Sequence, residues 1–220
     1  MVSAVGSSLD RQAFARFADL LDYPSEPVSG RARACAASVR EASPEAAALL
    51  EEFAAYAEEQ SLGTLQEVYT GAFDLDAVPG GNVTCYPYVG HHLFGESHVR
   101  SRFLVELRRR FLAHGFSVER EMSDHVVVLL QFMARCDDDE LVGDLIGEAL
   151  LPALGTMLGE PATVVEAADP PNARVRYQRV LHALRLTLAS STNGARTGAG
   201  TGRIARAARS GRLRARRERV

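Results

Sequence analysis

Apolar residues recur at the spacing of an α-helix along most of the chain. The first predicted helix covers residues 10–22 and ends before Pro24, because proline disfavours a helical conformation in the residue that precedes it. Its buried face should comprise Phe14, Phe17, Ala18 and Leu21. The same spacing predicts helices over 31–41, 44–60, 61–72 and 97–115, with Ser43, Ser61 and Ser97 as N-caps.

The helix at 97–115 should bury one face only. Its large apolar residues recur every four positions, and its arginines, among them Arg100, occupy the other faces. The apolar positions are Val99, Phe103, Leu107 and Phe111.

The second half of the chain continues the helical pattern. Residues 123–136 begin with Ser123 as the expected N-cap and are apolar on almost every side, which predicts a central, buried helix. An acidic run at 137–140 favours the start of another helix, which should kink or restart at Pro152. The sequence at 169–171 opens a last helix, and only 162–165 has the composition of a strand. We therefore expect an all-α protein built as a single helical bundle.

Two segments interrupt this pattern. Residues 74–90 are rich in proline and glycine, which predicts a long internal loop. From residue 190 onward the chain is mostly Gly, Ala, Thr, Ser and Arg, with too few apolar residues to offset the entropy of ordering. The predicted organisation is a helical domain at 1–189 and an arginine-rich, flexible tail at 190–220.

Charge divides along the same boundary. The 220 residues carry a formal net charge of −3, and all 25 basic residues are arginines. Nine arginines and one glutamate give the tail a charge of +8, which leaves the body at −11. The tail has no aromatic residue to stack on bases, and the acidic body would repel phosphates, so nucleic acid is not an expected partner.

Several other classes lack their sequence signals. The chain has no run of about 20 apolar residues and no signal-peptide pattern, so we expect a cytoplasmic protein without stable membrane insertion. Its three cysteines, at 35, 85 and 136, form no Cys-x-x-Cys pair, which suits a reducing compartment. The glycine-rich phosphate-binding and dinucleotide-binding motifs and the Gly-x-Ser-x-Gly elbow do not occur.

The densest group of unusual residues is CYPYVGHHLFGES at 85–97. Loops of this kind often bind a ligand. A metal-dependent enzyme would use the histidine cluster His91, His92 and His98, with Cys85 as a further ligand, but the spacing matches no known zinc pattern. The alternative is structural, in which the aromatic side chains of this segment fill the junction between two helical layers.

A second group, Glu121-Met122-Ser123-Asp124-His125, leads into the buried helix. An acid beside a histidine is compatible with general-base chemistry. We favour a structural interpretation, in which Ser123 and Asp124 cap the helix and His125 lies against its first turn.

Four segments in order carry a family resemblance: YTGAFDLD (69–76), CYPYVGHHLFGES (85–97), FLAHGF (111–116) and EMSDHVVVLLQFM (121–133). Together they resemble the NarJ/TorD/DmsD superfamily of molybdoenzyme chaperones, in particular the branch that serves nitrate reductase and type II dimethyl sulfoxide reductases. The family's Glu-x-Pro-Asp-His signature maps onto Glu121, Asp124 and His125, with Ser123 in place of the proline. Its tyrosine-to-Phe-Asp element maps onto Tyr69, Phe73 and Asp74.

The resemblance implies a chaperone without enzymatic activity or a cofactor of its own. Its expected partner is the molybdopterin-containing catalytic subunit of a nitrate reductase or dimethyl sulfoxide reductase-type enzyme. The chaperone would bind the twin-arginine-like leader of that subunit, assist cofactor insertion, and delay export or membrane docking. A homodimer formed by exchange of helices is compatible with such a bundle.

The acidic body suits a leader that carries paired arginines and an apolar stretch, because the apolar side can lie in a groove and carboxylates at its rim can attract the arginines. We expect Tyr86, Tyr88 and Phe94 to line the groove, and Asp74, Glu121 and Asp124 to form its rim. The complete set of expected peptide-binding residues is Asp74, Tyr86, Pro87, Tyr88, His92, Phe94, Glu121, Asp124 and His125.

Overall fold

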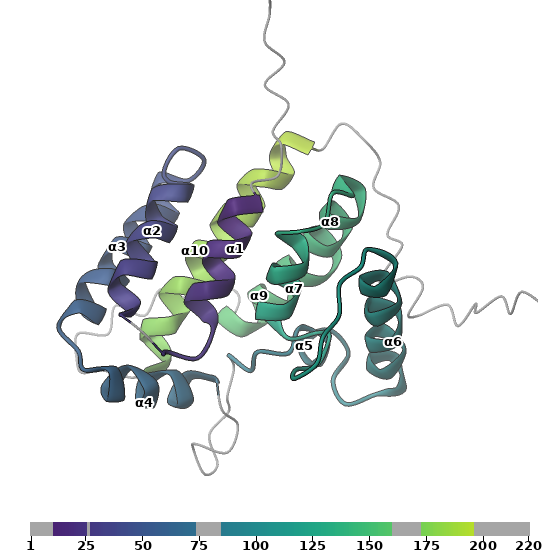
Figure 1. The fold of residues 1–220 in the computed structure, drawn as a ribbon, viewed down its shortest axis with the longest axis horizontal. Helices are drawn as coiled ribbons and strands as arrows, with labels where there is room; N and C mark the ends of the chain where they lie inside the picture. The colour runs from purple at the N-terminus through teal and green to yellow at the C-terminus, as the bar shows by residue number, and fades with distance from the viewer. Residues whose placement is uncertain (1–10, 26, 74–84, 160–172, 196–220) are drawn as a thin grey trace, which may run out of the picture.

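A computed structural model describes residues 11–25, 27–73, 85–159 and 173–195, and over these ranges the protein is all-α, which confirms the predicted fold class (Figure 1). The helices are α1 (Arg11–Leu21), α2 (Val28–Val39), α3 (Pro44–Glu58), α4 (Leu62–Phe73), α5 (Val89–Phe94), α6 (His98–Ala113), α7 (Val126–Met133), α8 (Asp139–Leu145), η1 (Ile146–Leu150), α9 (Leu151–Leu158) and α10 (Ala173–Ala195).

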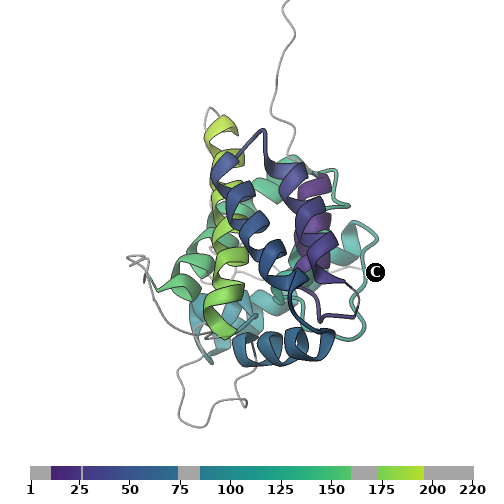
Figure 2. The same cartoon turned by 90° about the vertical axis from the view of Figure 1, so that its left-hand side faces the viewer.

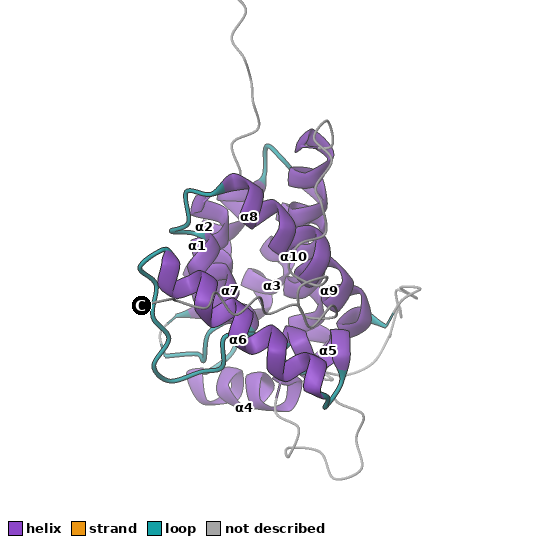
Figure 3. Cartoon of the chain, turned by 90° about the vertical axis from the view of Figure 1, so that its right-hand side faces the viewer, coloured by secondary structure: helices purple, strands orange, loops and turns teal. Residues whose placement is uncertain are grey.

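The helices pack as two connected groups. In the first, α2 packs between α1 and α3, and α10 packs against α3, α4 and α9. Helix α4 lies across the lower ends of this group (Figures 1 and 2). In the second group, α5 contacts α6 and α9, while α7 packs on α1 and links the two groups. Helix α6 lies on the outside of the second group (Figure 3). It packs on α7 through Phe111, whose ring centroid lies 4.4 Å from that of Phe132.

Most of the predicted helix starts are confirmed. Ser43, Ser61 and Ser97 each accept a hydrogen bond from the backbone N–H three residues later, at 3.3, 3.1 and 3.4 Å. In the acidic run, Asp138 accepts from the Leu141 N–H at 2.9 Å and caps α8. These short polar side chains satisfy donors that the first helical turn leaves without intrahelical partners.

The start of α7 differs from the prediction. The N-cap is His125, whose Nδ1 accepts from the Val127 N–H at 3.3 Å, and the predicted cap Ser123 lies outside the helix. His125 pairs with Tyr88 in an isolated antiparallel bridge, and its backbone is extended, with ψ at 134°. This pairing holds residues 123–125 out of the helix, so that α7 begins at Val126. The interior of α7 is buried on nearly every side, as predicted.

Three further boundaries differ from the sequence prediction. Helix α2 begins at Val28, three residues before the predicted start at 31. Helix α5 lies at the end of the predicted loop 74–90 and continues to Phe94. Helix α10 extends to Ala195, six residues beyond the boundary expected at 189. The strand-like stretch 162–165 and the expected helix start at 169–171 lie outside the described residues.

The stretch from α8 to α9 is continuous but changes its hydrogen-bonding pattern in the middle. Residues Ile146–Leu150 form a π-helical turn, after which the N–H of Leu151 donates to the carbonyl oxygen of Ile146, five residues back. Pro152 follows directly and has no N–H to donate. The wider turn accommodates this proline at the place where the sequence predicts a kink or restart.

The same stretch, Asp139–Leu158, is long and apolar enough to cross a membrane by length and composition. Within its most apolar window, 61% of the residues are buried inside the bundle, as in the core helix of a soluble protein. Asp144 and Glu148 interrupt the apolar run of this stretch, which is why the sequence shows no continuous run of about 20 apolar residues.

The core of the first group is built around Tyr177 on α10. Its ring lies 5.2 Å from that of Phe53 on α3, and 5.4 and 5.1 Å from those of Tyr69 and Phe73 on α4. Tyr177 is fully buried. These ring contacts fix α4, and with it Tyr69, relative to the rest of the bundle.

Candidate functional site

Two of the four sequence segments that carried the family resemblance, 85–97 and 121–133, lie side by side in the structure. The N–H of Val89 donates to the carbonyl oxygen of Asp124 at 2.9 Å, and the N–H of Val126 donates to that of Pro87 at 2.9 Å. These bonds flank the bridge between Tyr88 and His125. The connection from α6 to α7 therefore runs back to the start of α5 (Figure 1).

A buried ion pair fixes this junction from inside. Asp124 is 0% exposed, and its Oδ2 accepts hydrogen bonds from the N–H of Gly90 on α5 and from Nε of Arg100 on α6, both at 3.2 Å. The Arg100 guanidinium also donates to Glu96 and to Met122 Sδ, the latter at 3.5 Å. Burial raises the pKa of Asp124, while the charge of Arg100 opposes that shift.

Gly90 is the residue that lets α5 approach this pair. A Cβ at position 90 would lie 2.6 Å from Asp124 Oδ2 and 3.0 Å from Phe103 Cδ1. Both distances are shorter than ordinary contacts with a side-chain carbon, so any larger residue would push α5 away from α6. Glycine at position 90 therefore allows α5 to pack closely against α6, and this position does not accommodate a larger residue without a shift of α5.

Half-buried rings cover the outer side of the junction, and we call Tyr86, Tyr88, His91 and His92 the aromatic patch. The Tyr86 ring lies 4.8 Å from that of Tyr88 and 5.0 Å from that of His91. His92 Nε2 lies 2.7 Å from the carbonyl oxygen of Tyr86, within hydrogen-bond distance. Burial lowers the pKa of His92, which favours its neutral form.

An exposed carboxylate borders the aromatic patch. The Tyr88 hydroxyl donates to Glu121 Oε2 at 2.9 Å. The pKa of Tyr88 is raised mainly by burial and secondly by this hydrogen bond to a carboxylate, so the phenol stays protonated. Next to Glu121, the side chain of Met122 is 47% exposed. This edge offers a negative charge and an apolar side chain to a partner.

His125 lies beneath the patch. Its ring is 5.2 Å from that of Tyr88, and its Nδ1 serves as an acceptor, so the neutral ring carries its proton on Nε2. Burial lowers the pKa of His125, while the charges of Glu121, Asp22 and Asp124 oppose that shift. The histidine is therefore a structural cap in its neutral form.

Helices α1 and α4 supply a second edge to the site. Tyr23, after α1, is 50% exposed, and its ring lies 5.4 Å from that of Tyr69 on α4. The Tyr69 hydroxyl donates to the Leu21 carbonyl oxygen at 3.1 Å. Helix α1, which ends next to Asp22, packs on α7, which begins shortly after Glu121. Both carboxylates raise the pKa of Tyr69 and oppose the lowering of the His125 pKa.

The structure separates the predicted peptide-binding residues into three groups. Tyr86, Tyr88, His92 and Glu121 come together at the aromatic patch and its edge. Pro87 and His125 are buried beneath it. Phe94 is half-buried and packs on Phe103 with ring centroids 5.3 Å apart, as in the structural alternative.

Two predicted rim residues do not lie on a described surface. The prediction for Asp124 was wrong in placement, because the carboxylate is buried against Arg100 and neither borders a groove nor caps α7. Asp74 lies outside the described residues. Arg100 was expected on an outer face of its helix and is only 7% exposed, since it neutralises Asp124.

Sequence reasoning missed Asp22, Tyr23 and the pairing of Arg100 with Asp124. Asp22 and Tyr23 stand at the end of α1 and belong to no motif. For Arg100 a partial signal existed, since Gly90 and Asp124 both occur in segments of the resemblance and Arg100 lies between them in the chain, but these contacts join positions up to 34 residues apart.

His91, His92 and Cys85 of the metal alternative have other partners, His92 through the Tyr86 carbonyl oxygen. His91 Nδ1 lies 3.1 Å from Glu96 Oε1, and the buried Cys85 Sγ lies 3.9 Å from the Met157 carbonyl oxygen. Within the described ranges, no group of three or more His, Cys, Asp or Glu side chains is placed to hold a metal ion. The geometry therefore gives the metal-enzyme interpretation no support.

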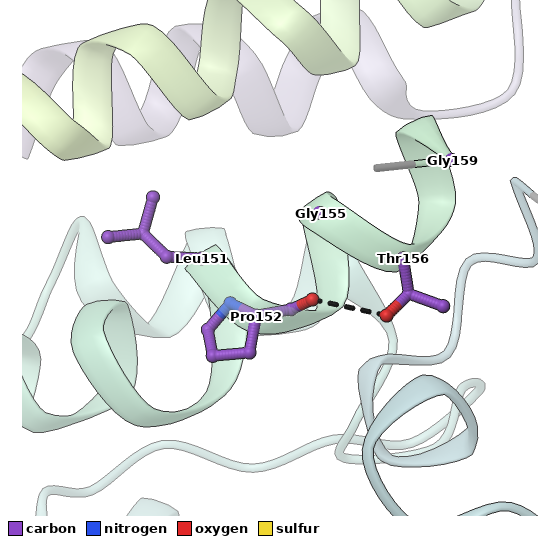
Figure 4. Close-up of a pocket in the computed structure, with 5 residues that line it drawn as sticks. All are labelled: Leu151, Pro152, Gly155, Thr156 and Gly159. Carbon is purple, nitrogen blue, oxygen red and sulfur yellow. Dashed lines mark hydrogen bonds between the residues drawn. The ribbon is translucent and has the colours of Figure 1, made fainter. Parts of the chain in front are cut away.

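Two cavities lie away from this junction. One, of about 300 Å³, is on α9, where the Thr156 hydroxyl donates to the Pro152 carbonyl oxygen at 3.3 Å (Figure 4). The other, of about 560 Å³, lies between the ends of α2, α3 and α4. Neither is lined by a residue of the aromatic patch.

Comparison with known proteins gives one finding of family membership. A family model described as "Nitrate reductase delta subunit" matches residues 38–160, which is more than half of the chain. The match includes the aromatic patch, the buried pair and α7. No curated protein matches the chain.

Proposed function

We propose that this chain, which belongs to the nitrate reductase delta subunit family, binds the amino-terminal segment of the molybdopterin-containing catalytic subunit of a nitrate reductase. Membership confirms the resemblance to the NarJ/TorD-type chaperone superfamily. The family consists of chaperones for nitrate reductase assembly, not of catalytic enzymes, and its partner is the catalytic subunit. The leader segment and the surface that receives it are our proposal.

The observation that carries the proposal is the hydrogen-bonded pair of Tyr88 and Glu121 at the edge of the aromatic patch. It presents a carboxylate and a half-buried ring on a base fixed by the buried ion pair of Asp124 and Arg100. A preorganised surface loses little entropy when it binds a peptide. Arginine suits this surface, because its guanidinium pairs with carboxylates and stacks on aromatic rings.

The leader would lie with its apolar residues against the rings and Met122, and with an arginine at Glu121. The chaperone would hold the subunit until its cofactor is inserted, and would thereby delay export or membrane docking. Its own part requires no catalysis and no bound cofactor. This role also implies that the chaperone works in the cytoplasm.

The test is titration of a synthetic peptide, the amino-terminal segment of the host's nitrate reductase catalytic subunit, into full-length protein variants. Glu121→Arg should weaken binding about tenfold, because it replaces attraction by repulsion; tenfold corresponds to about 1.4 kcal/mol. Tyr88→Phe should have a smaller effect, since it keeps the ring and loses only the hydroxyl that orients Glu121.

The matched control is Glu41→Arg, which makes the same charge change at an exposed carboxylate in the turn between α2 and α3. It should leave the affinity unchanged. If Glu121→Arg and Tyr88→Ala both fold normally and bind the peptide as tightly as the wild type, the proposed surface is wrong.

A further inference from the structure

Two exposed carboxylates at the site lack a positively charged partner. Among the described residues, Asp22 accepts a hydrogen bond from the Tyr23 N–H at 2.8 Å, and Glu121 accepts from the Tyr88 hydroxyl, but neither forms an ion pair. Six other exposed or half-exposed carboxylates of the body form ion pairs with arginine: Glu51, Glu52, Glu58, Glu96, Glu106 and Asp139. Other exposed carboxylates, such as Glu41 and Glu67, also form no ion pair among the described residues, but they lie away from the aromatic patch. The site therefore retains negative charge that the described part of the chain does not neutralise.

Exposed apolar side chains accompany these carboxylates. Tyr23 follows Asp22 and is 50% exposed, and Met122 follows Glu121 and is 47% exposed. They are among the few large apolar side chains that the described residues expose. We call these four residues the acidic edge. It suits a segment that alternates arginine with apolar residues.

The chain itself contains a segment of this kind. Residues 196–220 hold nine arginines and a single glutamate, and their apolar residues include Leu213 and Val220. Arg216 and Arg217 are adjacent, which is the feature that the resemblance predicts for the leader of the client. The segment therefore has the same chemistry as the proposed client peptide.

Length does not prevent the segment from reaching the acidic edge. It follows α10 directly, and its 25 residues span at most about 80–90 Å when fully extended. The whole of α10, with 23 residues, is only about 35 Å long. The segment is thus long enough to run back along the body from the end of α10.

We propose that the arginine-rich segment 196–220 occupies the acidic edge when no client is bound, and that the client leader displaces it. Tethering gives such a segment an effective concentration in the millimolar range, so even a weak contact is occupied much of the time. Displacement by the client rests on the proposed function, whereas the contact between segment and edge does not.

The contact is tested directly in the full-length chain with the photo-crosslinker p-benzoylphenylalanine in place of Leu213. Illumination should yield intramolecular cross-links to peptides that contain Tyr23 or Met122, mapped by mass spectrometry. The cross-links should fall at least several-fold in the double variant Asp22→Arg, Glu121→Arg and in 0.5 M NaCl. The matched control, Glu41→Arg, should leave them unchanged.

Three outcomes would overturn the contact: cross-links to other parts of the body, cross-links between two copies only, or no cross-links while the segment binds vesicles rich in anionic lipid. The last result would assign the arginines to a membrane surface. Nucleic acid that co-purifies with the wild type and protects the segment from cross-linking would likewise contradict the proposal.

The displacement is tested by titrating the client peptide into the wild type and into full-length protein with Arg212→Gln, Arg214→Gln, Arg216→Gln and Arg217→Gln. We expect three- to tenfold tighter binding to the variant, since the competitor is weakened. Equal affinities without cross-links to the acidic edge would refute the inference but preserve the proposed function. Cross-links to the edge with no peptide binding to either protein would support the contact and refute the proposed function.

Discussion

One carboxylate oxygen of Asp124 joins three parts of the chain. Oδ2 accepts from Gly90 on α5 and from Arg100 on α6, while the residue itself belongs to the segment that precedes α7. Oδ1 is buried and has no hydrogen-bond partner among the described residues. The pair costs desolvation energy, so its value lies in fixing one arrangement of these parts.

The first prediction concerns Gly90, whose backbone lies close to Asp124 and Phe103. Gly90→Ala should lower the free energy of unfolding by about 1–3 kcal/mol, because the new Cβ would collide with Asp124 and Phe103. Chemical denaturation followed by circular dichroism measures this change. Gly143→Ala is the control, since nothing lies within 4 Å of its added Cβ, and it should be neutral or stabilising by up to about 1 kcal/mol. Equal effects at the two sites would show that packing at Gly90 is not limiting.

His125 makes the second prediction, which concerns pH. Its pKa in the folded protein lies below the ordinary value of about 6.5, so the unfolded chain binds more protons near pH 6. Stability should therefore be full above pH 6.5 and decline as the pH falls toward the folded pKa, with a slope of at most about 1.4 kcal/mol per pH unit for this group. Urea denaturation at pH 7.5, 6.5 and 5.5 measures the slope.

The companion variant is His125→Asn, because asparagine can cap α7 but does not titrate. It should reduce the slope, and the half-buried His92, whose pKa is shifted in the same direction, should account for part of the remainder. A variant with the slope of the wild type would show that His125 does not contribute.

The residues that sequence reasoning placed correctly are those whose role is local. Ser43, Ser61 and Ser97 cap helices through contacts three residues away, which the sequence displays directly. Arg100 and Asp124 were misplaced because their partners are 24 positions apart and burial depends on both being present. A charged residue is predicted to be exposed until its buried counter-charge is known.

At the scale of elements, the short helix α5 shows what periodicity cannot detect. It has six residues, less than two turns, and lies beside proline and glycine, so its sequence gives no helical repeat. Its position comes from the backbone bonds that Val89 and Pro87 form with Asp124 and Val126, and from contacts with α6 and α9. Longer helices such as α6 were predicted well, because Phe103, Leu107 and Phe111 form a continuous buried face.

The packing of α10 makes the third prediction. The Tyr177 hydroxyl is buried without a hydrogen-bond partner in the described structure, and burial raises the pKa of this phenol. Tyr177→Phe should therefore leave stability unchanged or raise it by up to about 1–3 kcal/mol. Tyr177→Ala should lower it by about 3–5 kcal/mol, because the ring fills the space between α3, α4 and α10. Thermal and urea denaturation compare both variants with the wild type; a destabilised Tyr177→Phe would reveal a partner for the hydroxyl.

At the scale of the whole molecule, composition and helical pattern were sufficient to predict an all-α bundle. They did not predict which helices meet, such as α7 with α1 or α10 with α3 and α4, because these contacts follow from the three-dimensional arrangement. The aromatic patch could be anticipated from the motif at 85–97, but Asp22 and Tyr23, which contribute to the acidic edge, follow a helix about 60 positions earlier. The division of charge between body and tail is visible directly in the sequence.

That charge division makes the fourth prediction. Client-peptide affinity should fall as ionic strength rises from 0.05 to 0.5 M, since the screening length shrinks from more than 10 Å to a few ångströms. The dependence should be weaker in Glu121→Gln, which lacks one of the attracting charges. Isothermal titration at four salt concentrations gives both slopes. Identical slopes would remove Glu121 from the charges that attract the peptide.

The π-helical turn at Ile146–Leu150 also determines which residues of α9 face the core. It holds one residue more than an α-helical turn would, so α9 is rotated by about 100° from where a regular helix would place it. In this orientation Leu154 and Met157 are fully buried, and α9 packs against α10 and α5. Removal of one residue within this turn, such as Gly147, would leave a regular α-helical turn and keep Leu154 and Met157 on the buried face. Removal of a residue between this turn and Leu154 would instead rotate both side chains by about 100° away from the core. A single deletion should therefore be tolerated better inside the π-helical turn than after it.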